Sequence, residues 1–239
     1  MIVWGIYIFR SRKLYIKKGM VLVVRIKPRG QIYLYGELHC KEKIMERQLE
    51  LWHNFYHNDN LRYLFLEHCY STTEFLNIWM RSDSDDILEM LYDIALAPDF
   101  PYIKDFFRTI KKDCSETVFY GTTPVYPPIG EKYLQYLEDN NQADSDKYSQ
   151  AQELMKKGRR LYKKYWGEWD DGYREENMVE NFIREFEKLN GESVMGIYGA
   201  MHIMLEPVEY FGDVPCLCYQ LKERYGKAVH FEDLSYLID

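Results

Sequence analysis

Strand-like runs alternate with helical patterns along most of the chain, and this alternation constrains the fold more than any other feature. Runs rich in β-branched and aromatic residues span residues 21–26, 31–35, 61–66, 116–120 and 193–198. Helical spacing of apolar residues predicts helices over residues 42–57, 73–80, 85–96, 102–112, 130–139, 147–165 and 172–189. Strands that alternate with helices predict an α/β fold, with a mainly parallel central sheet flanked by helices on both faces.

The N-terminal part of the chain departs from this alternation. The sequence "KPRGQ", residues 27–31, is typical of a hairpin turn between two successive strand-like runs. We therefore expect residues 1–30 to supply edge strands and an antiparallel edge at the N-terminus. The polar tract 138–150 is predicted to be a loop, but it is too short to mark a domain boundary. The prediction is a single α/β domain over residues 1–239.

Composition excludes several classes of partner. The chain has 239 residues, of which 46% are hydrophobic, enough to fill one substantial core. Its 31 Lys and Arg are scattered among 38 Asp and Glu, so no basic face for nucleic acid is expected. The five cysteines show no disulfide framework spacing, which favours a reducing compartment.

The apolar opening, residues 1–9, does not have the pattern of a targeting or membrane segment. It is much shorter than the roughly 20 residues that a transmembrane helix needs. Its charges follow the apolar run, whereas a signal peptide places them before it. We expect a cytoplasmic protein without a membrane partner, and Met20 is an alternative natural start. The sequence predicts no particular oligomeric state.

Polar side chains follow several of the strand-like runs. Ligands of open parallel sheets bind at the carboxyl ends of the strands, so these residues are candidates for a site. They are Glu37 and His39 after one run, Glu67 and His68 after another, and His202 after the last. Residues two apart on a strand point to the same side, so Glu37 and His39 are predicted to face one site. His68 would point to the opposite side from Glu67 and is predicted to support the site.

The same Gly-x-x-His pattern occurs at residues 36–39 and again at residues 199–202. One such pattern arises easily by chance, but two at strand ends, with Glu67 at a third, indicate a site. His39, Glu67 and His202 would suit a divalent metal such as Mn, Co or Zn with an open position for water. Alternatively, these residues would position the attacking water without a metal. Glu37 is predicted to be the general base in hydrolysis of an ester or amide in a small molecule or peptide.

The predicted helix 172–189 carries a polar ridge beside its apolar stripe. Arg174, Asn177 and Asn181 recur at i, i+3 and i+7, a spacing that an ordinary solvated face would also explain. Because this helix directly precedes the strand that ends at His202, we expect it to line the same cleft. Arg174 is predicted to stabilise an oxyanion or hold a substrate carboxylate. Substrate binding is assigned to Asn177, Asn181, Tyr120 and His68.

Other motifs are better explained by structure than by chemistry. His53 and His57 are four residues apart but lack the Glu of a metalloprotease motif, so the helix dipole explains them better. Cys216 and Cys218 could join His230 at a metal, but alternation along a half-buried strand is the preferred interpretation. The aromatic and basic run 159–173 is predicted to be a helix covering its own core.

The motifs "GELH", "FLEH", "REENMVEN" and "GAMH" occur in this order within residues 31–205. In this the chain resembles the superfamily of erythromycin esterase-like, ChaN-like haem-binding, TraB and Tiki proteins. The resemblance implies a site of Glu37, His39, Glu67 and His202, supported by Arg174 and by Asn177 or Asn181. It also implies a hydrolase, in some members metal-dependent, or a haem-binding protein without catalysis.

One motif departs from the family pattern. Where esterase-like members usually carry an Asp after a glycine, this chain reads "YGTTPVY", residues 120–126. A non-catalytic interaction module with a degenerate site is therefore a third hypothesis. No axial haem ligand follows from the motifs, although any of the 22 tyrosines could serve.

Overall fold

The computed structural model describes residues 12–17, 20–25, 30–96, 100, 102–163, 170–206 and 208–238. The apolar opening 1–9 and part of the aromatic and basic run 159–173 lie outside these residues. Among the helices of the described residues, none is long and apolar enough to cross a membrane.

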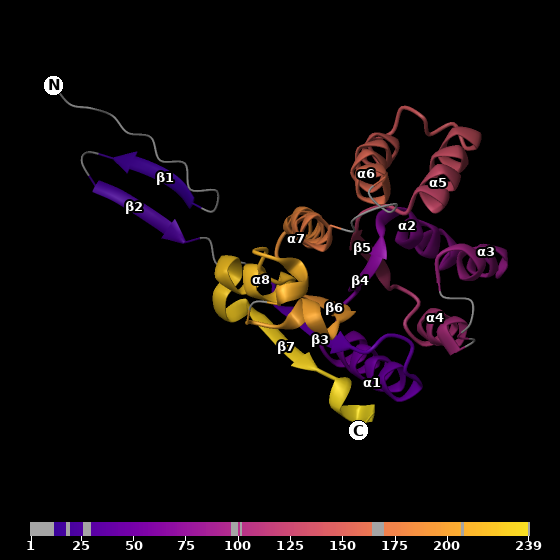
Figure 1. Ribbon diagram of the computed structural model, residues 1–239, viewed down its shortest axis with the longest axis horizontal. Coiled ribbons are helices and arrows are strands. Elements are labelled where there is room, and N and C mark those ends of the chain that lie inside the picture. Colours follow the sequence, from indigo (N-terminus) through magenta and orange to yellow (C-terminus); the bar gives the residue numbers. More distant parts are fainter. Residues whose placement is uncertain are drawn as a thin grey trace.

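The centre of the molecule is a five-stranded sheet in which every pair of neighbouring strands is parallel (Figure 1). The strands are β3 (Ile32–Glu37), β4 (Tyr63–Cys69), β5 (Val118–Thr123), β6 (Val194–Gly199) and β7 (Val229–Asp233). Their order is β5-β4-β6-β3-β7, so β6 lies between two strands that come much earlier in the chain. The predicted α/β class with a parallel central sheet is confirmed.

The predicted antiparallel edge at the N-terminus of this sheet is wrong. Strand β2 (Met20–Arg25) pairs antiparallel with β1 (Arg12–Lys17) in a separate two-stranded sheet. Strand β3 has β6 on one side and β7 on the other, both parallel to it. Both hydrogen-bonding edges of β3 are therefore occupied, and no edge is left for β2.

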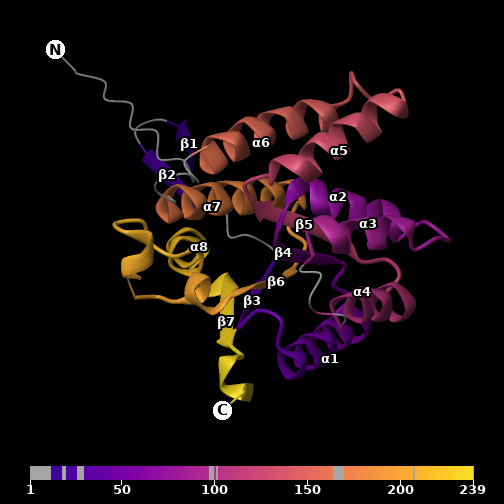
Figure 2. The same ribbon diagram turned by 45° about the vertical axis from the view of Figure 1, so that its right-hand side comes forward.

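Helices cover both faces of the central sheet (Figure 2). Helices from the first two thirds of the chain form the apolar core on one face, and two later helices form the core on the other face. The first group is α1 (Glu42–Asn58), α2 (Tyr70–Trp79), α3 (Asp86–Ile94), α4 (Tyr102–Asp113), α5 (Pro127–Asp139) and α6 (Asp146–Lys163). The second group is α7 (Asp171–Lys188) and α8 (Leu217–Tyr225).

Alternation along the strands decides which face each side chain serves. In β4, Leu64 and Leu66 join the apolar core under α1 to α6, whereas Phe65 joins the core under α7 and α8. Continuing this alternation, Glu67 faces α7 and His68 faces the α1–α6 side. In β3, Tyr35 belongs to the α1–α6 core, so Glu37 at the end of that strand lies on the same side.

Two predicted elements have other structures. Cys216 and Cys218 are buried at the start of helix α8, not on a strand, so the strand interpretation is wrong. The tract 138–150 contains the end of α5 and the start of α6, which leaves residues 140–145 between them.

His53 and His57 lie next to each other near the end of α1, with ring centroids 4.2 Å apart.

Candidate functional site

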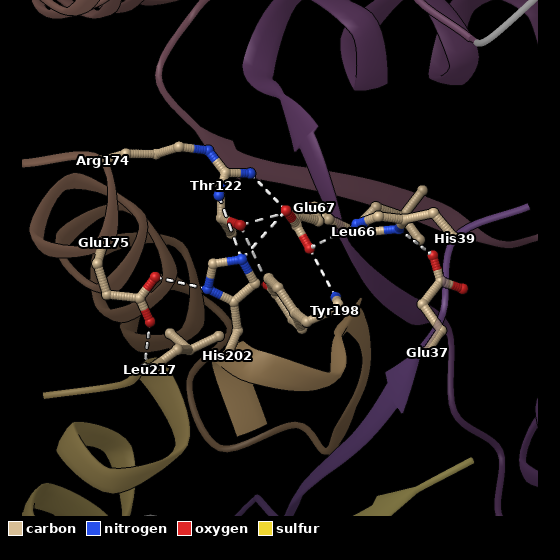
Figure 3. A network of polar contacts seen from close by, with 11 residues as sticks. Glu37, His39, Leu66, Glu67, Thr122, Arg174, Glu175, Tyr198, His202 and Leu217 are labelled. Carbon is tan, nitrogen blue, oxygen red and sulfur yellow. Dashed lines mark hydrogen bonds and ion pairs between the residues drawn. The ribbon is translucent and has the colours of Figure 1, made fainter. Parts of the chain in front are cut away.

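The two Gly-x-x-His motifs lie on neighbouring strands. In the parallel register of β3 and β6, Gly36 is opposite Tyr198 and Glu37 is opposite Gly199. Strand β4 borders the other side of β6 and contributes Glu67. Side chains from three adjacent strand ends and from helix α7 therefore meet at one edge of the sheet (Figure 3). The residues brought together are Glu37, His39, Glu67, Arg174 and His202.

Glu37 and His39 form the first carboxylate–imidazole pair of the site. Strand β3 ends at Glu37, and His39 lies in the following turn, where Cys40 has a φ of 59°. The turn, rather than strand alternation, brings His39 Nδ1 within 2.7 Å of Glu37 Oε1. The second oxygen of Glu37 accepts a hydrogen bond from Gln48 of α1. The hydrogen bond with Glu37 is the main reason why the pKa of His39 is raised.

Glu67 is the centre of the cluster. Its Oε1 accepts a hydrogen bond from Arg174 and lies 3.2 Å from His202 Nε2. Its Oε2 accepts the Gly199 N–H at 2.6 Å and lies 3.9 Å from His39 Nε2. Burial favours the protonated acid, but the neighbouring His202, Arg174 and His39 outweigh it and hold the pKa of Glu67 well below its usual range. Glu67 is therefore an anion at neutral pH and a poor proton acceptor.

His202 and Glu175 form a second carboxylate–imidazole pair. His202 Nδ1 lies 2.6 Å from Glu175 Oε2, and the other oxygen of Glu175 accepts the Leu217 N–H at 2.6 Å. Both side chains are buried, and the His202 ring stacks on Phe211 at 5.1 Å between centroids. Burial opposes the charged ring, but hydrogen bonds with Glu175 and Glu67 raise the pKa of His202 to about 9.

Arg174 enters the cluster from the first turn of α7. Asp170 caps this helix by accepting the Tyr173 N–H at 2.9 Å, which fixes where the helix begins. The Arg174 guanidinium then reaches Glu67 and comes within 3.2 Å of His202 Nε2. Two anions, Glu67 and Glu175, are thus balanced by Arg174 and a protonated His202.

Two residues of the site were not identified from the sequence, and they share one signal. Glu175 precedes Met178, Phe182 and Phe186 at helical spacing, so it occupies a place on the apolar stripe of α7. Gln48 similarly lies between Ile44 and Trp52 on the buried stripe of α1. A polar side chain on an apolar stripe must find a partner when it is buried, and both do so at the site.

Three predicted substrate-binding residues lie elsewhere. Asn177 donates to the Tyr173 carbonyl of its own helix at 2.7 Å, and Asn181 donates to the Thr122 carbonyl at 2.7 Å. The predicted polar ridge therefore faces the sheet below Arg174 and links α7 to β5. Tyr120 stacks on Phe65 at 4.9 Å and lines a different cavity, beside α2, α6 and α7. The structure does not bring these three side chains to the cluster.

Two cavities adjoin the cluster, and His68 and Ala95 line both. One has a volume of about 330 Å³ and is bordered by polar side chains, among them Glu67, Arg174 and Thr72. The other has a volume of about 340 Å³, begins beside Glu37 and His39 and is otherwise mainly apolar. The predicted cluster thus stands between a polar and an apolar hollow.

The residues present do not fit the predicted metal site. Both oxygens of Glu67 already accept hydrogen bonds, from Arg174 and from Gly199. His202 Nε2, which would have to ligate the ion, faces the Arg174 guanidinium at 3.2 Å, so the place of a cation is taken. Among the described residues, no group of three or more His, Cys, Asp or Glu is arranged to hold a metal.

The sequence matches no protein-family model and no curated protein. The fold, however, is similar to those of several solved structures. One is a protein from Bacillus cereus, 12% identical, with a TM-score of 0.60 over 86% of this chain and 65% of that one. Another is a mutant of the erythromycin esterase EreC in its open conformation, 11% identical, with a TM-score of 0.57 over 87% of this chain and 70% of the esterase.

A third similar structure is a succinoglycan biosynthesis protein, 14% identical, with a TM-score of 0.55 over 85% of this chain and 65% of that one. The chain thus spans about two thirds of the length of these proteins. At such identities the likeness concerns the fold, and it confirms the expected similarity in fold to an erythromycin esterase.

Proposed function

We propose that this chain is a hydrolase that cleaves an ester or amide bond in a small molecule or peptide, with His39 as the general base. His39 Nε2 would take a proton from water, and the oxygen of that water would attack the carbonyl carbon. The protonated His39 would then give its proton to the departing alcohol or amine. Each proton is returned, so no further reactant is needed.

The environment of the His39 ring carries this proposal. Its Nδ1–H donates to Glu37 at 2.7 Å, which leaves Nε2 as the proton acceptor. The side chain is 58% exposed, so water can reach it. The 3.9 Å between Nε2 and Glu67 Oε2 is too long for a hydrogen bond, and a water molecule that contacts both atoms would be held for attack.

This assignment changes the role first expected for Glu37. One of its oxygens accepts from His39 and the other accepts from Gln48, so both are engaged by neighbouring side chains, whereas His39 Nε2 is open to water. Glu37 instead orients the imidazole and stabilises its positive charge, as a carboxylate does behind many catalytic histidines.

Arg174 is the proposed stabiliser of the oxyanion. Its guanidinium lines the polar cavity next to Glu67, and its hydrogen bond with Glu67 holds it in one position. A fixed cation beside the reacting carbonyl lowers the energy of the negative charge that develops on the oxygen. Glu67 therefore supports the reaction by holding Arg174 and the attacking water.

Hydrolysis of p-nitrophenyl acetate and a matched anilide by the purified chain tests the proposal. We expect His39→Ala to lower kcat/KM by roughly a hundredfold or more, because general base catalysis contributes about 10²–10⁴-fold. Thermal unfolding should hardly change, since the ring is largely exposed. His53→Ala, an exposed histidine of α1, is the matched control and should leave the rate unchanged. Equal rates for His39→Ala and the wild type would refute the proposal.

Further measurements on the purified protein distinguish this proposal from a metal-dependent hydrolase, a haem-binding protein and a non-catalytic interaction module. Dialysis against a chelator should leave the rate unchanged, whereas a loss that Mn, Co or Zn restores would support the metal-dependent reaction. A Soret band on adding haemin, lost in His39→Ala, would support the haem-binding alternative. The absence of both turnover and a Soret band would leave the interaction module with a degenerate site.

A further inference from the structure

The cavity beside Glu37 and His39 is apolar over most of its wall. It lies between α1, α4 and the sheet and has a volume of about 340 Å³. Its apolar lining consists of Met45, Leu66, Ala95, Leu96, Ile103, Phe106, Phe107 and Ile197. Its polar lining includes Glu37, to which both Gln48 and His39 bond.

The hollow is partly open to solvent, and its volume is similar to that of the polar cavity beside it, so its lining matters more than its size. Small-molecule sites range from about 300 to 1,000 Å³ and are mostly apolar with a few polar groups. The cavity also meets the reactive end of the cluster, since its lining includes His39. Its lining and place are those of a substrate pocket.

The chemistry of the lining selects an apolar occupant. Glu37 and Gln48 bond to each other, and Glu37 also bonds to His39, so their main hydrogen-bonding capacity is used. His68, which also lines the cavity, has a pKa lowered by burial and is uncharged at neutral pH. The described lining contains no Lys or Arg that could pair with an anionic group. An apolar group, in contrast, gains the full benefit of leaving water.

The cavity on the other side of His68 and Ala95 has the opposite character. Arg174 and Glu67 border it, together with the hydroxyl-bearing Thr72 and Thr123. A substrate that places its scissile carbonyl between His39 and Arg174 would therefore have one end in each environment.

We infer that the apolar cavity binds an aryl or medium-length alkyl group attached directly to the scissile bond, and that the substrate is amphipathic. This inference rests on the proposed hydrolase function. The apolar group belongs either to the acyl part or to the alcohol part of the ester, and the two share the same recognition chemistry.

Chain-length series test the inference and separate these two sources. In one series, p-nitrophenyl esters run from acetate to octanoate; in the other, acetate esters run from methanol to octanol. In whichever of the two series places its growing chain in the cavity, kcat/KM should rise about fourfold for each added methylene until the cavity is full, as expected for a buried CH₂ group. Flat profiles in both series would overturn the inference. Acetate turnover that still requires His39 would meanwhile preserve the proposed function.

Filling the cavity tests its location. Ile103→Trp, on α4, should lower the ratio of octanoate to acetate turnover at least tenfold, or the corresponding ratio in the alcohol series. Lys112→Trp, exposed on the same helix, is the matched control and should keep the wild-type ratio. If Ile103→Trp does not fold, Met45→Trp enters the cavity from α1 and takes its place. An unchanged ratio in a folded cavity variant would refute the location.

Direct binding tests the cavity without turnover. Calorimetric titration with octanoate and with 1-octanol, the apolar products of the two series, should detect binding of at least one of them. Ile103→Trp should weaken that binding at least tenfold, and Lys112→Trp should not. Binding without ester cleavage would support the cavity and reject the hydrolase; no binding of either product would reject the cavity.

Discussion

The site contains two carboxylate–imidazole pairs of nearly equal geometry in different surroundings. The distance from Nδ1 to the carboxylate is 2.7 Å for Glu37–His39 and 2.6 Å for Glu175–His202. The His39 side chain is 58% exposed, whereas that of His202 is 5% exposed. Both Nε2 atoms face Glu67, at 3.9 Å for His39 and 3.2 Å for His202.

The difference in burial between the two pairs indicates which of the two Gly-x-x-His histidines is accessible to water. Both nitrogens of His202 contact protein groups, so this ring joins α7, η2 (Ala200–Ile203) and β4. The Nε2 of His39 has no protein group within ordinary hydrogen-bond distance among the described residues, so it can meet water. Burial turns one Gly-x-x-His motif into a structural support and leaves the other available for chemistry.

The buried pair should dominate stability. We expect Glu175→Ala to lower the free energy of unfolding by roughly 3–5 kcal/mol, because it leaves a buried imidazolium without one of its partners. Urea unfolding measures this loss. Glu176→Ala, exposed on the same helix, should stay within about 0.5 kcal/mol of the wild type. Equal stabilities for Glu175→Ala and Glu176→Ala would contradict the structural role of the Glu175–His202 pair.

The two pairs should respond to pH in opposite ways. The folded-state pKa of His202 is about 9, above the ordinary value of 6.5, so its contribution to stability is complete below pH 6.5. That contribution, about 3 kcal/mol, is lost as the pH rises through 9. Activity should instead rise above pH 6.5, as His39 loses the proton that its raised pKa retains.

Urea midpoints and kcat/KM measured from pH 6 to 9.5 check this divergence. His202→Asn should remove much of the pH dependence of stability over that range, since the titrating ring is gone. A parallel rise of stability and activity would contradict the assignment of the two pairs.

The exposed pair should dominate activity. Glu37→Gln keeps the size of the side chain but removes the charge that orients and stabilises protonated His39. We expect kcat to fall about tenfold to a hundredfold, as for other groups that position a reactive residue, with a small change in stability. Stopped assays on p-nitrophenyl acetate measure the effect, and Glu46→Gln, exposed on α1, is the control. A wild-type rate in Glu37→Gln would contradict the role of Glu37.

The smallest expected effect is at the glycine that separates the two pairs. A Cβ at Gly199 would lie 3.1 Å from His39 Nε2 and 3.2 Å from Glu67 Oε2, so these atoms would move by a few tenths of an ångström. The backbone tolerates alanine, because φ is −52°. Gly199→Ala should therefore lower kcat/KM severalfold, since small misplacements of reacting groups slow catalysis. Calorimetry should show a change in stability within about 1 kcal/mol. An undiminished rate would show that the close packing of Gly199 against His39 and Glu67 does not affect catalysis.

The sequence predicts well which polar side chains lie together at the sheet edge, because their positions depend on local patterns. Apolar runs that end in polar residues identify the carboxyl ends of strands, and parallel strands present those ends at one edge. This reasoning brings Glu37, His39, Glu67 and His202 together without any knowledge of strand order. Helix limits also follow closely from periodicity; the predicted helix 172–189, for example, is α7 (Asp171–Lys188).

Features that depend on partners far along the chain are not predictable in the same way. The turn signal at residues 27–31 is local, and it does not reveal that β3 takes β6 and β7 as neighbours. The ridge of Arg174, Asn177 and Asn181 indicates a shared face, but only Arg174 contacts Glu67 and His202, whereas Asn181 bonds to the Thr122 carbonyl of β5. The sequence does not predict Glu175 as a site residue, because its place on the apolar stripe is that of a core position.

The place of β6 in the sheet has a consequence for how the chain folds. Its six residues are all buried and lie between β3 and β4, which precede them by more than a hundred residues. We expect the central sheet to assemble only after residue 199 has been synthesised, with a high barrier from closing so long a loop. Nascent chains ending before residue 194 should be cleaved rapidly by protease, and protection of such chains would argue against this order. The candidate site and the central sheet would then be completed by the same late strand.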